Sequence, residues 1–138
     1  ARTLQLVDDI IEGIPIMGSV AAGGLVETYD DVKENLDISD IYKKKDVFAL
    51  TVNGDSMIDA CIAHGDIVLM EKISDCNSIR NGDIVSAMVP GLGSTLKYFM
   101  RKNNKILLEA ANTNYEPIEL DFDQVVFQGR LLAVWRKV

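Results

Sequence analysis

Apolar and polar residues alternate along much of the chain with the two-residue period that is typical of half-buried β-strands. In the clearest case Phe48, Leu50 and Val52 alternate with more polar or smaller neighbours. The pattern predicts strands over 47–53, 66–72, 83–89, 94–100, 105–110 and 124–135. Turn residues separate these runs, as in Asn81-Gly82-Asp83, Pro90-Gly91-Leu92-Gly93 and Asn103-Asn104. We therefore expect a mainly β fold of short strands with little helix.

A different pattern follows the first of these strands. The apolar residues of the stretch 57–62 have helical spacing, and His64-Gly65-Asp66 then forms a predicted turn. Ser56 lies between the strand end and the predicted helix, where free backbone N–H groups could hold an oxyanion. The stretch from Ser56 to Asp59 also fits the Ser-x-x-Asp capping box, in which the serine only closes the first helical turn. From these residues alone, the capping role is the more common one.

A nucleophilic serine needs a base, and the chain offers two candidates. His64 is the single histidine, and its position in a turn favours an exposed residue over a member of a Ser/His/Asp triad. Lys97 lies among large apolar residues, where desolvation would favour the neutral amine that can accept a proton. A solvated strand lysine is the alternative. Other lysines lie in polar clusters, namely Lys43, Lys44, Lys45, Lys102 and Lys105.

Composition narrows the class of protein. A chain of 138 residues with 48% hydrophobic and 25% charged residues is typical of one globular domain. It contains neither an apolar run approaching the ~20 residues of a membrane span nor a pattern like a signal peptide. Cys61 and Cys76 have no metal-binding spacing, so we expect reduced thiols, a cytoplasmic location, and no metal or cofactor. The net charge of −7 predicts a poor DNA-binding surface.

Three motifs occur in a fixed order along the chain. They are Val20-Ala21-Ala22-Gly23, then Gly54-Asp55-Ser56-Met57 followed by Asp59 and Gly65-Asp66, and then Thr95-Leu96-Lys97. Ser56 and Lys97 are 41 positions apart. Together these motifs resemble the LexA family of self-cleaving repressors, which shares its Ser-Lys chemistry with UmuD, phage repressors and, more distantly, signal peptidases. The similarity extends from about Ile14 to the end of the chain.

The resemblance implies a coiled sheet of antiparallel strands and an autoproteolytic serine endopeptidase. Ser56 would be the nucleophile and Lys97 the base, and the backbone N–H groups of Asp55 and Ser56 would hold the oxyanion. The bond that is cut would join Ala22 and Gly23. The small residues around this bond form either a flexible turn or an extended segment that enters a narrow groove, where the carbonyl of Ala22 meets Ser56.

The resemblance also implies a domain organisation and partners. Residues 1–13 would be a linker remnant after a winged helix-turn-helix domain that this chain lacks, and 14–138 the peptidase and dimerisation domain, with a cleavage loop at about 19–29. We expect a homodimer through the terminal strand 125–135. The activator would be a RecA filament on single-stranded DNA, formed after DNA damage in the SOS response. Operator DNA would be bound through the missing domain and not through this chain.

Other assignments stay open at this point. A UmuD-like accessory of a translesion polymerase would need only a short N-terminal arm. A phage repressor has similar motifs. A dimerisation module that has lost cleavage is disfavoured by the intact motifs without being excluded.

Overall fold

Residues 13–20, 26–28, 34–43 and 46–138 are described by a computed structural model, which divides the chain into the units 1–43 and 44–138. In the first unit, β1 (Ile14–Ile16) pairs antiparallel with β4 (Glu34–Leu36). A second pair consists of β2 (Gly18–Val20) and β3 (Val26–Thr28), and α2 spans Ser39–Lys43. The Ala22–Gly23 bond and the predicted linker, apart from Gly13, lie outside the described residues.

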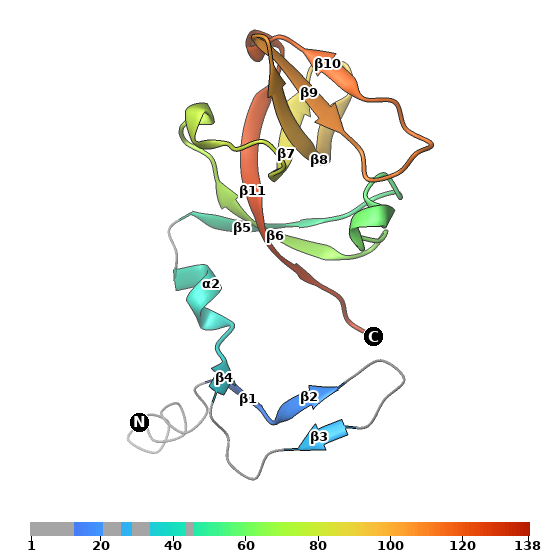
Figure 1. The fold of residues 1–138 in the computed structure, drawn as a ribbon. Helices are drawn as coiled ribbons and strands as arrows, with labels where there is room; N and C mark the ends of the chain where they lie inside the picture. The colour runs from blue at the N-terminus through green and yellow to red at the C-terminus, as the bar shows by residue number, and fades with distance from the viewer. Residues whose placement is uncertain (1–12, 21–25, 29–33, 44–45) are drawn as a thin grey trace. The chain divides into compact units, whose positions relative to one another are not determined.

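The unit 44–138 is built on one seven-stranded antiparallel sheet (Figure 1). Its spatial order is β10-β9-β8-β7-β11-β6-β5. In chain order the strands are β5 (Val47–Thr51), β6 (Ile67–Lys72), β7 (Ile84–Val89), β8 (Gly93–Lys102), β9 (Lys105–Glu109), β10 (Ile118–Leu120) and β11 (Val126–Trp135). Three single 3-10 turns lie between them, η1 (Ile58–Ala60), η2 (Cys76–Ser78) and η3 (Phe122–Gln124).

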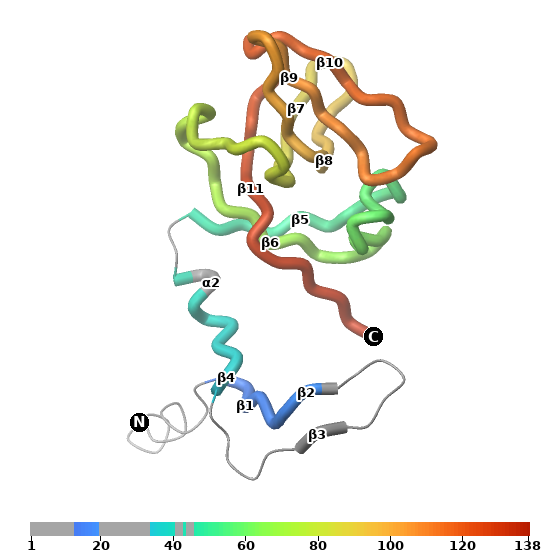
Figure 2. Tube along the Cα trace, in the orientation of Figure 1, coloured from blue at the N-terminus to red at the C-terminus, as the bar shows by residue number. Residues whose placement is uncertain are grey.

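Strand β11 connects the two halves of this sheet. Its first part pairs with β7 and its second part with β6, and the ladder is irregular between Phe127 and Gly129 and again between Leu131 and Ala133. Such bulges bend a strand, and Figure 2 shows β11 running from one group of strands to the other. Gly129 lies at the crossing, where a Cβ atom would come 2.7 Å from the ring of Phe48. The glycine therefore permits the close contact between the two halves.

Two clusters of buried side chains form the core of this unit. One lies among β7, β8 and β9, around Phe99 and Val85. The other contains Met57, Val68 and Met70, and it packs beneath the turn that carries Ser56. The fold thus places the predicted nucleophile directly above a buried apolar cluster.

The mainly β fold with antiparallel strands and little helix is confirmed, and the six predicted strands are observed with ends that differ by at most two residues. The turn at Asn103-Asn104 is also as expected, since both residues have positive φ, at 51° and 64°. The strands β1, β2, β3, β4 and β10 were not predicted, because three residues are too few to show a period. No helix in the described ranges has the length and apolar character needed to span a membrane.

The helix expected over 57–62 is wrong. The structure has only the single turn η1, which ends at Cys61 in the left-handed conformation with φ 62°. The spacing of apolar residues instead reflects the burial of Met57 and Ile62 in the cluster below. The capping role of Ser56 is also not observed, because the cap position is Met57 and no side chain caps the turn.

Candidate active site

Ser56 lies on a tight turn that leaves the end of β5. Gly54 has φ +91°, a conformation that favours glycine. Backbone bonds tie the start of the turn to the segment before β6, from Val52 N to Asp66 O and from Gly65 N to Val52 O, each 2.8 Å long. Gly54 N also donates to Nδ1 of His64 at 2.9 Å. The exposed His64 therefore braces the turn, and it makes no hydrogen bond with Ser56 in the described part of the chain.

Lys97 reaches Ser56 from β8. Its Nζ atom lies 3.2 Å from Oγ of Ser56, although 41 positions separate the two residues. Lys97 is only 6% exposed, so the expected apolar placement is confirmed and the solvated alternative is wrong. Lys97 shares one face of β8 with Thr95, while Leu96 and Tyr98 point to the other face and pack against the Met57 cluster. The long side chain of Lys97 carries its amine to Ser56.

Burial controls the charge of this lysine. The pKa of Lys97 is lowered from its ordinary value because burial penalises the ammonium form. Its polar neighbours are all uncharged oxygens: Oγ of Ser56, Oγ1 of Thr95 at 2.5 Å and the Leu96 carbonyl at 3.2 Å. No carboxylate of the described residues forms a salt bridge with Nζ. The site can therefore present a neutral amine at a lower pH than a solvated lysine could.

Ser56 lines a cleft of about 260 Å³. One wall comes from the end of β5 and the residues after it, and another comes from the first residues of β8. The remaining lining side chains belong to β6, β7 and the serine turn; the full set is Leu50, Thr51, Val52, Asn53, Ser56, Met57, Val68, Ser86, Ser94, Thr95 and Leu96. A cleft of this size next to a strand edge can take an extended peptide with small side chains.

Neither cysteine belongs to this site. Cys61 and Cys76 are exposed and unpaired by any disulfide. Among the residues that the structure describes, no cluster of His, Cys, Asp or Glu could hold a metal ion.

Sequence reasoning missed three side chains at the site. Thr95 contacts Nζ of Lys97, and its position two residues earlier in the same strand is a signal that could have found it. Asn112 and Tyr115 both donate hydrogen bonds to Asp55, at 2.9 and 2.6 Å. No local pattern announces these contacts, because 57 and 60 positions separate the partners.

Comparison with known proteins gives the class to which this fold and site belong. A family model described as Peptidase S24-like matches residues 15–132. The chain therefore belongs to the peptidase S24-like family of serine peptidases, which agrees with the resemblance seen in the motifs.

Within this family, the chain is similar to several proteins named LexA. The chain is 31% identical over 136 residues to the transcription regulator LexA of Synechocystis sp., covering 99% of this chain and 67% of that protein. It is 38% identical over 125 residues to the LexA repressor of Koribacter versatilis, with 91% and 58% covered. The LexA repressor of Clostridium novyi is 35% identical over 143 residues, with 99% and 68% covered. The chain thus spans 58 to 68% of the length of these relatives.

Proposed function

We propose that this chain is the self-cleaving domain of a LexA-type repressor and that it cuts its own Ala22–Gly23 bond. The observation that carries the proposal is the 3.2 Å separation of the buried Lys97 Nζ from Ser56 Oγ. A serine and a lysine with no carboxylate or imidazole between them are the minimal pair for nucleophilic attack with an amine as base.

The chemistry follows from the lowered pKa of Lys97. The neutral amine accepts the proton of the Ser56 hydroxyl while Oγ attacks the carbonyl carbon of Ala22. The backbone N–H groups of Asp55 and Ser56 stabilise the resulting oxyanion. Protonated Lys97 then returns its proton to the Gly23 nitrogen as the bond breaks, and water later hydrolyses the acyl-enzyme.

The composition of the proposed substrate segment suits the cleft. Ala21, Ala22, Gly23 and Gly24 are the smallest residues available, and the cleft beside Ser56 is only about 260 Å³. Bulky side chains at these positions would prevent an extended segment from lying against the cleft walls. Because enzyme and substrate share one chain, the effective concentration is high, and control of docking becomes the regulatory problem.

Regulation would act on docking of the cleavage segment. A partner that binds the docked form better than the undocked form shifts the population toward cleavage. We propose that this partner is a RecA filament on single-stranded DNA, since the relatives are named LexA. Cleavage would then separate the dimerising domain from a DNA-reading domain, and the avidity of two linked half-site readers would be lost.

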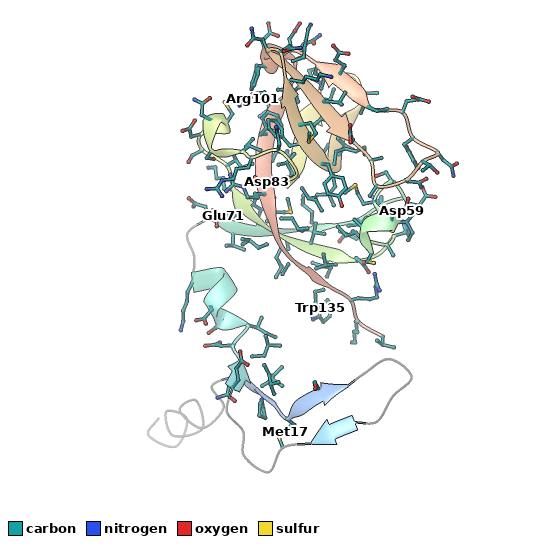
Figure 3. The ribbon with its side chains drawn as sticks, in the orientation of Figure 1. Met17, Asp59, Glu71, Asp83, Arg101 and Trp135 are labelled. Carbon is teal, nitrogen blue, oxygen red and sulfur yellow. The ribbon has the colours of Figure 1, made fainter. Side chains whose placement is uncertain are left out.

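We further propose that the domain dimerises through the last part of β11. Among the described strands, β11 pairs with β7 only as far as Arg130, while pairing with β6 continues to Trp135. The stretch 131–135 therefore has a strand edge to which no described strand is paired. Val134 and Trp135 are 41% and 48% exposed there, and Figure 3 labels Trp135 near the end of the strand. An antiparallel pair with a second copy would cover both features.

The proposal is tested by an intact-mass time course of the chain at neutral and alkaline pH. We expect two fragments that divide between Ala22 and Gly23, formed faster as pH rises because more Lys97 is neutral. The Ser56→Ala and Lys97→Ala variants should keep the fold and give no fragments. If neither cleavage nor a difference from the Ser56→Ala chain were seen at any pH, with and without a RecA filament on single-stranded DNA, the peptidase assignment would be wrong.

A further inference from the structure

The turn that carries Ser56 is contacted by a distant segment, residues 111–115, which follow β9. Asp59 N donates to the Ala111 carbonyl at 2.8 Å, and Asn112 Nδ2 donates to the Asp55 carbonyl at 2.9 Å. In Figure 1 the green turn around η1 lies beside the orange loop after β9, and Figure 3 labels Asp59 at this place. The serine turn is therefore held from the side of this loop as well as by His64.

Asn112 uses different atoms for its bond to the serine turn and for its bonds within its own loop. Its Oδ1 accepts from Asn114 N at 2.9 Å, and its carbonyl accepts from Tyr115 N at 3.1 Å. These two bonds fix the local turn of the 111–115 segment. The Nδ2 group is left to donate to the Asp55 carbonyl, so the donor is already oriented before it meets Asp55.

The Asp55 carbonyl determines where a proposed oxyanion donor points. It shares one planar peptide unit with Ser56 N–H, and in a trans peptide the C=O and N–H bonds point in opposite directions. The carbonyl accepts from Asn112 Nδ2 and, within the turn, also from Ile58 N at 3.2 Å. The shorter bond from Asn112 helps to hold Ser56 N–H so that it points away from the 111–115 segment. No described residue accepts a hydrogen bond from Ser56 N–H, so this donor stays available for the oxyanion.

Tyr115 fixes the side chain of the same residue. Its hydroxyl donates to Oδ1 of Asp55 at 2.6 Å. The pKa of Tyr115 is raised, because this hydrogen bond to a carboxylate favours the protonated phenol. The contact therefore persists to higher pH than an ordinary tyrosine would allow.

We propose that Asn112 is a positioning residue that sets the direction of Ser56 N–H, and that Tyr115 supports it through Asp55. This inference rests on the proposed self-cleavage, whose oxyanion donors it concerns. Neither side chain touches the reacting atoms. Both act by fixing one peptide plane and one carboxylate.

The Asn112→Asp variant separates the two jobs of Asn112. The new carboxylate keeps an acceptor for Asn114 N but can no longer donate to the Asp55 carbonyl. Because loss of an oxyanion donor typically slows acyl transfer about 10²–10³-fold, we expect self-cleavage of the full chain to slow by roughly 10-fold or more. The matched control is Asn114→Asp, which adds the same charge two positions away and should change the rate less than about two-fold.

Two further readouts distinguish positioning from a loss of structure. The pH midpoint of the cleavage rate and the thermal unfolding midpoint should match those of Asn114→Asp, since Lys97 and the core are untouched. Phosphorylation of Ser56 by diisopropyl fluorophosphate, in which Oγ displaces fluoride, should slow in parallel with cleavage, and it does not require the chain's own segment to dock. Tyr115→Phe should show the same pattern with a smaller, several-fold effect.

The outcomes separate this inference from the function on which it rests. If Asn112→Asp cleaves itself and reacts with the probe as fast as Asn114→Asp, the positioning role is wrong. If the wild-type chain reacts with the probe but never cleaves itself, the proposed function fails, and the probe rates alone decide the role of Asn112. If the wild-type chain does neither, both are overturned.

Discussion

Asp66 and Lys97 are both almost fully buried in the unit 44–138, at 2% and 6% exposure, yet the fold treats their charges in opposite ways. Asp66 accepts from Nε and Nη2 of Arg136 at 2.7 and 2.6 Å and from Ala63 N at 2.8 Å. Lys97 meets only uncharged oxygens. One buried charge is fully paired, and the other has no opposite charge beside it among the described residues.

The surroundings of the two groups distinguish a structural charge from a reactive one. The hydrogen bonds from Arg136 and Ala63 lower the pKa of Asp66 to about 2, so its carboxylate is stable in the folded chain. Desolvation lowers the pKa of Lys97, so its ammonium form is less favoured there than in water. A desolvated ionisable group of this kind lowers stability, and it persists where the rest of the fold offsets that loss. Such groups are common at functional sites.

The largest expected effect comes from replacing Lys97 with methionine, which keeps the length and removes the amine. Self-cleavage should fall by at least about 10³-fold, because the base is lost. The free energy of unfolding should rise at neutral pH, because folding of the wild-type chain must either bury the ammonium group or release its proton, and methionine requires neither. A cleavage assay and chemical denaturation of the same variant check both. If the variant cleaves itself, or loses stability as a core deletion does, Lys97 is not a reactive group that costs stability.

The same replacement also has a pH signature. Since the folded-state pKa of Lys97 is lowered, the unfolded chain holds more protons between that pKa and the ordinary lysine value. Stability should therefore increase with pH across this window in the wild-type chain. The increase should be smaller in Lys97→Met, which serves as the reference for all other groups that titrate there.

Asp66→Asn should give the reverse result, a loss of stability with little loss of chemistry. The folded-state pKa is about 2 against an ordinary 3.8, so the stabilisation by Asp66 is present above about pH 4 and is lost as pH falls to about 2. The variant should unfold several degrees lower at neutral pH and lose this acid dependence. Self-cleavage of the folded chain should stay within about five-fold of the wild-type rate.

A control with the same chemical change is available at the surface. Asp121 pairs with Lys105 at 2.6 Å, but both side chains are about half exposed, at 53% and 49%. Because exposed pairs contribute little, Asp121→Asn should leave the unfolding temperature nearly unchanged. Equal effects of Asp66→Asn and Asp121→Asn would show that burial of the Asp66 pair has no energetic consequence.

Apart from the surface control, the smallest effect is expected from Thr95→Val. It removes the acceptor at 2.5 Å from Lys97 Nζ while keeping the shape of the side chain. Since that acceptor favours the ammonium form, the pH midpoint of cleavage should move further down. The rate above the midpoint should drop several-fold, because the amine is less well oriented. A shift of the midpoint to higher pH would mean that Thr95 acts in another way.

Sequence patterns predicted the fold where strands are long and half-buried. The alternation around Phe48 and the Asn103-Asn104 turn gave the correct strands, whereas the three-residue strands β1 to β4 and β10 carry no period. The apolar spacing of 57–62 led to the wrong prediction of a helix. Met57 and Ile62 belong instead to a loop with one 3-10 turn, and both side chains are buried beneath it. In such a loop, burial of side chains does not require a helix.

At the candidate site, too, some residues could be predicted from the sequence and others could not. The motifs indicated Ser56 and Lys97, and the pairing of β7 with β8 and of β5 with β6 supplies the scaffold that holds them 3.2 Å apart. Thr95 could have been found from the two-residue period of its strand. Asn112 and Arg136 could not, because their partners Asp55 and Asp66 are 57 and 70 positions away and only the completed fold brings them together.

NMR titration can show directly whether the Lys97 amine is neutral at a pH where the other lysines are charged. The Ser56→Ala chain, labelled with ¹³C at lysine Cε, should not cleave itself during the measurement. We expect one lysine resonance, absent from the Ser56→Ala/Lys97→Met chain, that titrates at lower pH than the rest. We also expect the wild-type cleavage rate to rise over the same pH range. If the Lys97 resonance instead titrates together with those of the exposed lysines, Lys97 is not a base of lowered pKa and the proposed mechanism is wrong.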